Sequence, residues 1–75
     1  MTRDINAIAV EIIHDWRSPA YGARPYLGAM LTMTSIDEDY GMDSGRSIIR
    51  YFLANAQTWR GEIARRIKAE LKGML

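Results

Sequence analysis

Apolar residues recur at helical spacing in several stretches of the chain, which proline, glycine and acidic residues separate. The first stretch runs from Asp4 to Trp16. Its apolar positions follow intervals of three and four, which places them in one stripe: Ile5, Ile8, Ala9, Ile12, Ile13 and Trp16. Pro19 follows and lacks the amide donor that a continuing helix needs. The pattern therefore predicts a helix over 4–16, followed by a loop over 18–24.

A second helix is predicted from Pro25 to Ser35, because proline suits a first helical turn. Its apolar positions, which include Tyr26, Leu27 and Met30, spread around much of the circumference. Such breadth is typical of a helix that lies between other helices or is covered by another chain. Residues 36–43 then form an acidic loop. Their spacing does not match a calcium-binding EF-hand, so a solvated loop or a docking site for basic helices is predicted instead.

Residues 44–75 predict two further helices, over 44–57 and 58–73. Asp43 or Ser44 is suited to cap the first of them, and Thr58 the second. The second helix is expected to bury a row of apolar residues spaced four apart, which are Trp59, Ile63, Ile67 and Leu71. A tight bend near 55–58 is favoured, and one long helix is the alternative. The fold class expected is all-α: a compact three- or four-helix bundle in one domain (1–75), ending in a C-terminal helical hairpin.

The length and composition of the chain bear on its oligomeric state and its cellular compartment. A chain of 75 residues buries a modest core, so a second copy would help to cover its apolar surface, and self-association is a further expectation. The chain has no cysteine, which fits a reducing cytoplasm. No apolar run approaches the roughly 20 residues that span a bilayer, and Asp4, Glu11 and Asp15 within the first apolar stretch argue against a signal peptide. A cytoplasmic protein without membrane contact is expected.

Charge is unevenly distributed, although the formal net charge is only +1. Residues 1–43 hold three basic and seven acidic side chains, and residues 44–75 hold seven basic and two acidic ones. Such asymmetry marks an anionic partner in some proteins. It also arises where two halves of a chain, or two copies, attract each other, and this plainer interpretation is favoured.

The last predicted helix carries the candidate binding surface. Arg65, Lys68 and Lys72 share one face at intervals of three and four, and Arg60 precedes them. Glu62, Arg66 and Glu70 are expected to form a ladder of ion pairs along the same helix. Arg46 and Arg50, one turn apart, are expected to remain in water. Two helices with a bend between them resemble a helix-turn-helix in outline, so a DNA-binding regulator is the alternative function.

No catalytic constellation is present in the sequence. The single histidine, His14, lies off the apolar stripe, and there is neither a phosphate-binding glycine loop nor a nucleophile motif. We therefore expect no enzyme activity, no cofactor and no metal site. The favoured function is a non-enzymatic protein-protein interaction module. Its candidate aromatic anchors are Tyr21, Tyr51 and Trp59, although each of these is more often a core residue than an interface residue.

Three segments carry a resemblance to a known group of proteins: PYLGAM at 25–30, SIIRYFLANAQTWRGE at 47–62 and IKAEL at 67–71. They resemble a set of small uncharacterised proteins encoded by phages and prophages of actinobacteria, over roughly 12–75. The resemblance implies an accessory phage protein made in the host cytoplasm, with a host or phage protein as its partner. It transfers no catalytic residue to this chain.

Overall fold

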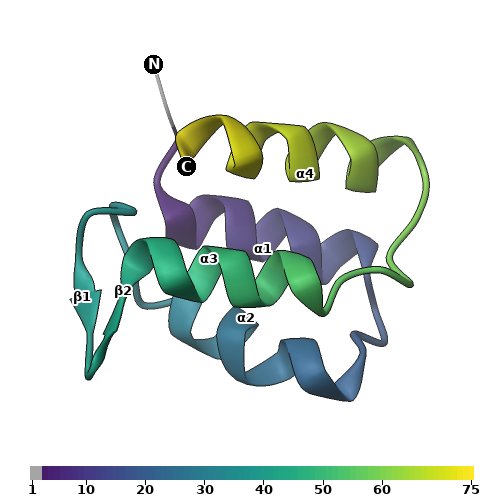
Figure 1. Ribbon diagram of the computed structural model, residues 1–75. Helices are drawn as coiled ribbons and strands as arrows, with labels where there is room; N and C mark the ends of the chain where they lie inside the picture. The colour runs from purple at the N-terminus through teal and green to yellow at the C-terminus, as the bar shows by residue number, and fades with distance from the viewer. Residues whose placement is uncertain (1–2) are drawn as a thin grey trace.

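Four helices and one small β-hairpin make up the computed structural model, which describes residues 3–75 (Figure 1). The helices are α1 (Ile5–Asp15), α2 (Arg24–Met30), α3 (Gly45–Ala54) and α4 (Glu62–Met74), and a 3-10 helix, η1 (Tyr21–Ala23), precedes α2. The strands β1 (Asp39–Tyr40) and β2 (Asp43–Ser44) pair antiparallel. The mainly helical fold is confirmed. The expectation of an all-α chain is wrong in one respect, because the acidic loop forms this hairpin.

The helices pack in pairs around one apolar cluster. α4 packs mainly on α1, α2 packs on both α1 and α3, and the hairpin extends from the start of α3 at one end of the molecule (Figure 1). The apolar stripe predicted for α1 is buried apart from Ile13, which is 38% exposed. The largest fully buried side chains come from every helix and from the segment after α2; they are Ile5, Ile8, Ile12, Met30, Met33, Ile49, Phe52, Ile67 and Leu71.

Three aromatic rings join distant parts of the chain at one end of this cluster. Trp16, just after α1, stacks on Trp59 with ring centroids 5.7 Å apart and planes 10° apart. Phe52 of α3 meets both indoles edge-on, with its centroid 6.3 Å from each. Such pairs add about 0.5–1.5 kcal/mol each beyond the area that they bury. The cluster therefore fixes the segment between α3 and α4 against α1.

The second predicted helix is shorter than expected, because the residues that follow it form hydrogen bonds to the start of α1. α2 ends at Met30 instead of continuing to Ser35. The backbone carbonyl groups of Met33 and Thr34 accept hydrogen bonds from the first amides of α1, at Asn6 and Ile5 (2.9 and 3.0 Å). These amides have no partner within their own helix. The segment after α2 thus caps α1 and is not free to remain helical.

The C-terminal half contains two helices, as predicted, but the break between them is longer and later. Ser44 caps α3 through its hydroxyl, which accepts from the Ser47 amide. α3 then ends at Ala54, and α4 begins only at Glu62, after Gly61 with φ 112°. Neither a bend confined to 55–58 nor a single long helix is present. We call residues 55–61 the connector.

Trp59 lies in the connector and not in a helix, which shifts the buried row of α4. The residues that α4 buries are Ala64, Ile67 and Leu71, whereas Ile63 is 39% exposed. The connector is also longer than the three- or four-residue turn of a helix-turn-helix. In Figure 1 α1 is drawn between α3 and α4, and each of these two helices packs mainly on another helix, so they do not form the predicted C-terminal hairpin.

Candidate docking face

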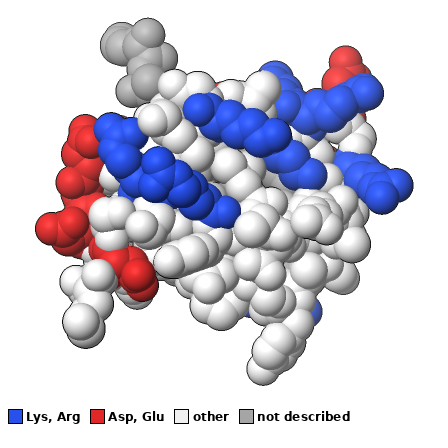
Figure 2. All heavy atoms as spheres, viewed as in Figure 1, with Lys and Arg blue, Asp and Glu red and all other residues white. Residues whose placement is uncertain are grey.

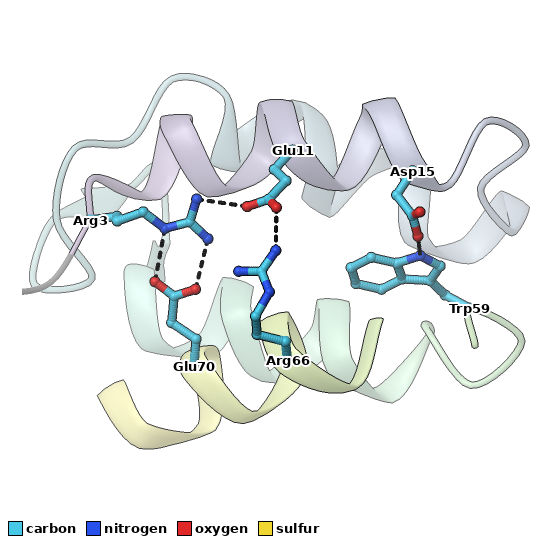
Figure 3. A network of polar contacts seen from close by, with 6 residues as sticks. All are labelled: Arg3, Glu11, Asp15, Trp59, Arg66 and Glu70. Atoms are coloured by element: carbon cyan, nitrogen blue, oxygen red, sulfur yellow. Dashed lines mark hydrogen bonds and ion pairs between the residues drawn. The ribbon is translucent and has the colours of Figure 1, made fainter. Parts of the chain in front are cut away.

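Four charged side chains join α1 to α4 in one network (Figure 3). The Arg3 guanidinium donates to both carboxylate oxygens of Glu70, at 2.7 and 3.0 Å, and to Glu11 at 2.7 Å. Glu11 also accepts from Arg66. The predicted ladder along α4 is therefore wrong: among the described residues, the recorded ion pairs of Arg66 and Glu70 are with the N-terminal part of the chain.

The network shifts the pKa values of Arg3, Glu11 and Glu70 so that the charged form of each is favoured. Hydrogen bonds from Arg3, and then from Arg66, hold the pKa of Glu11 below its ordinary value. A hydrogen bond from Arg3 likewise lowers the pKa of Glu70. The two carboxylates raise the pKa of Arg3, so it stays charged. Exposed ion pairs contribute only about 0–1 kcal/mol each to stability. Because these two cations and two anions contact one another in a single network, they also determine which side of α4 faces α1.

This network predicts how stability depends on pH. Because the folded-state pKa values of Glu11 and Glu70 are lowered, the network stabilises the fold above the ordinary glutamate pKa of about 4.3, and this contribution is lost as the pH falls through the lowered values. We expect the urea midpoint to change little from about pH 7 to pH 5 and to fall at lower pH. In Arg3→Gln this fall should be shallower.

The matched control for this measurement is Arg24→Gln, since the side-chain hydrogen bond recorded for Arg24 within residues 3–75 is to the Pro19 carbonyl, at 3.1 Å, and no carboxylate lies within 4.0 Å of it there. It removes the same charge and should keep the wild-type pH profile. If Arg3→Gln and Arg24→Gln showed the same profile as the wild type below pH 5, the assigned role of the network would be wrong.

The side of α4 away from this network is basic, and the end of α4 meets the start of α3. Arg46 of α3 donates to the Met74 carbonyl at 3.0 Å, so this side of α3 faces the end of α4. Arg50 lies one turn further along the same side. On α4, Arg65, Lys68 and Lys72 follow the spacing that places them together. We define the basic face as Arg50, Arg60, Arg65, Lys68 and Lys72.

Figure 2 shows Lys and Arg atoms spread across this side of the molecule, over α3 and α4. Within residues 3–75, none of the five cations of the basic face has a carboxylate oxygen within 4.0 Å. By contrast, Arg3, Arg46 and Arg66 are all paired with carboxylates. Of the cations in the C-terminal half, Arg46 and Arg66 are thus neutralised, whereas the five of the basic face are left uncompensated.

Lys68 differs from its neighbours, because it also holds the connector. Its Nζ donates to the Trp59 carbonyl at 2.6 Å and lies 5.8 Å from the Trp59 ring centroid. Partial burial lowers the pKa of Lys68, and the charges of Lys72 and Arg60 lower it further. Both of these charges therefore act on Lys68, as expected for cations on one face. Of the four candidates from the sequence, Arg60, Arg65 and Lys72 are exposed, and Lys68 is half-buried.

Arg50 is the residue of this face that the candidate set from the sequence did not include. Its distance of one turn from Arg46 is visible in the sequence, but which side of α3 turns toward α4 is decided by packing. The hydrogen bond from Arg46 to the Met74 carbonyl shows which side this is.

The three candidate aromatic anchors lie in different surroundings. Trp59 is 2% exposed, and its indole Nε1 donates to Asp15 at 2.8 Å (Figure 3). Tyr51 is 45% exposed on α3, and its ring lies 5.4 Å from that of Tyr26. Tyr21 is 86% exposed in η1. The structure therefore does not bring the three together, and only the two tyrosines present ring area to solvent.

One cavity of about 310 Å³ lies between the N-terminal end of α1 and the start of α3. Its charged residues are Arg3, Asp4, Asp37 and Arg46, so opposite charges are balanced within it. His14 lines a shallower hollow with Ile13 and Arg17. Over residues 3–75, no three His, Asp or Glu side chains are grouped as metal ligands would be. The basic face is accordingly the feature that we take as the candidate site.

No family model, curated protein or solved structure matches the chain. In the part of the chain that the structure describes, no helix combines the length and the apolar character needed to cross a bilayer.

Proposed function

We propose that the protein is a small non-enzymatic interaction module that docks its basic face on an acidic surface of a partner protein. One observation carries the proposal: five cations gather over α3, the connector and α4, and none has a carboxylate within 4.0 Å among residues 3–75. Uncompensated charge of this kind steers association and selects partners of opposite sign. The resemblance to phage-encoded proteins suggests that the partner is a host or phage protein in the bacterial cytoplasm.

The neighbouring acidic residues favour a protein partner over nucleic acid. Asp and Glu atoms gather at the left edge of the face in Figure 2, where the hairpin lies. A phosphate backbone that followed the basic face would run into these carboxylates at its edge, and like charges repel. A protein surface is able to present acidic groups to one part of the face and basic groups to the other.

The test is capture of partners by tagged protein from an actinobacterial lysate, with a matched pair of variants. Arg65→Gln/Lys72→Gln removes two exposed cations from the face, whereas Arg17→Gln/Arg24→Gln removes two exposed cations that lie outside it. Lys68 is left intact because it holds the connector. We expect a stoichiometric protein to be captured by the wild type and the control, and binding to the face variant to be weaker by about five- to thirty-fold, which corresponds to about 1–2 kcal/mol.

Treatment with nuclease separates the two candidate functions. A partner that survives nuclease and distinguishes the two variants supports the protein-docking function. Equal loss with both variants contradicts it. Material that nuclease releases supports the alternative, a DNA-binding regulator, whose affinity for a defined duplex should fall steeply with salt concentration.

A further inference from the structure

The β-hairpin is fixed firmly at its base. The Gly45 amide donates to the Glu38 carbonyl at 2.6 Å. The Glu38 carboxylate accepts from the amides of Thr34 and Ser35, at 3.2 and 3.1 Å. Asp37 pairs with Arg46 at 3.1 Å. The base of the hairpin is therefore tied both to α3 and to the segment after α2.

The tip of the hairpin, in contrast, contributes little to the core. Met42 is 102% exposed and Tyr40 is 44% exposed, while Gly41 turns the chain with φ 63°. Asp39 and Asp43, on the two paired strands, have no cation within 4.0 Å among residues 3–75. An apolar tip between two unpaired carboxylates, held on a fixed base, is preordered for binding, so little conformational freedom is lost on contact.

The surface that complements this tip lies on the same molecule. The basic face has uncompensated cations, and Leu53 follows Arg46 and Arg50 at helical spacing, half-buried on the same side of α3. In Figure 2 the acidic hairpin occupies one edge of the face, and Lys and Arg atoms extend across it toward the opposite edge. A twofold axis through the middle of this face would place each acidic edge over the basic region of the other copy.

We propose that two copies of the chain associate face to face about such an axis, with the hairpin of each docked on the basic face of the other. The interface is isologous, so every contact occurs twice and the assembly closes as a dimer. Asp39 and Asp43 face the cations near the start of α4, and Met42 packs beside Leu53. A standard interface removes about 800 Å² from each partner, roughly a sixth of the 4784 Å² that one copy exposes.

This dimer has a consequence for binding, because it covers the basic face. A partner protein and a second copy then compete for the same cations. The dimer uses the face of the proposed function, but it requires no other partner. The dimer and the docking on a partner protein are therefore tested by different measurements.

The experiment is a charge swap followed by sedimentation equilibrium and native mass spectrometry. Two charge-swap variants are used: the hairpin variant is Asp39→Lys/Asp43→Lys, and the reversed-face variant is Arg60→Glu/Arg65→Glu. Each places like charges in contact, so each should weaken its own dimer by about a hundredfold or more. An equimolar mixture restores opposite charges at both contacts and should give a one-to-one heterodimer. Arg17→Glu/Arg24→Glu, outside the face, should stay dimeric.

The wild-type dimer should also weaken as ionic strength rises from about 0.1 M to 1 M, where the screening length falls from about 10 to 3 Å. Met42→Ser, at a fully exposed site that does not support the fold, should weaken it several-fold. The proposal is overturned if the wild type is monomeric at low salt, or if either charge-swap variant dimerises as the wild type does. It is also overturned if both variants show the wild-type circular dichroism spectrum and their mixture still fails to form the heterodimer.

The hairpin variant also separates this proposal from the proposed function. It is expected to be a monomer with an intact basic face, so it should capture an acidic partner protein at least as well as the wild type. Charge-swap dimerisation without such capture would support the dimer and contradict the docking function. Capture of a partner by a wild-type protein that does not dimerise would support the docking function and contradict the dimer.

Discussion

Replacing Trp59 by alanine is expected to remove about a third or more of the protein's free energy of unfolding at room temperature. Truncation of a buried tryptophan destabilises a fold by about 3–5 kcal/mol. A chain of this length has about 4–11 kcal/mol in total, at 0.05–0.15 kcal/mol per residue. Trp59 is 2% exposed, stacks on Trp16 and meets Phe52 edge-on. Its loss would also loosen the connector, because Trp59 is one of its two buried residues, the other being the much smaller Ala56.

Urea unfolding followed by circular dichroism measures this loss. Trp59→Phe should retain much of the stability, while losing the hydrogen bond to Asp15 and the spectral signature of two stacked indoles. The matched controls are Tyr51→Ala and Tyr21→Ala, at 45% and 86% exposure, where we expect losses below about 1 kcal/mol. A Trp59→Ala protein as stable as these two would show that the ring is not a core residue. Of the three aromatic anchors, only the tyrosines are suitable for binding tests.

The parts of the fold that the sequence predicts well are those decided by local pattern. The apolar stripe of α1 identifies a helix within one residue at each end, and Ser44 is recognisable as a cap from its type and position. Both depend on residues within one or two turns of each other. The same reasoning places Arg65, Lys68 and Lys72 on one side of α4 before any tertiary contact is known.

The parts that the sequence does not predict depend on contacts between distant residues. α2 stops early because the carbonyl groups of Met33 and Thr34 are used by α1. Thr58 has the residue type of a cap, yet burial of Trp59 in the aromatic cluster requires an irregular connector until Gly61. The same limit applies to the candidate site. Nothing local indicates that Arg66 and Glu70 turn toward the N-terminal segment, which is what leaves the basic face uncompensated.

A pair of glycine substitutions is expected to shift stability in opposite directions. At Gly45, an added Cβ would lie 2.4 Å from the Ile36 carbonyl oxygen and 2.8 Å from that of Glu38. Both are backbone atoms, so relief requires the hairpin base to move away from α3. We expect Gly45→Ala to destabilise the protein by about 1–3 kcal/mol, as overpacking does elsewhere. At Gly28, inside α2, the added Cβ meets nothing within 4 Å, and we expect Gly28→Ala to stabilise by about 0.5–1 kcal/mol.

With a urea dependence of about 1 kcal/mol per molar, the midpoint of Gly45→Ala should fall by about 1–3 M and that of Gly28→Ala should rise by about 0.5–1 M. Amide exchange at residue 45 should accelerate in Gly45→Ala, because its hydrogen bond to Glu38 is the one that strain disrupts first. Equal midpoints for the two variants would mean that the hairpin base moves without resistance. The hairpin would then not be preordered, and its docking on a second copy would lose the entropic advantage on which that proposal depends.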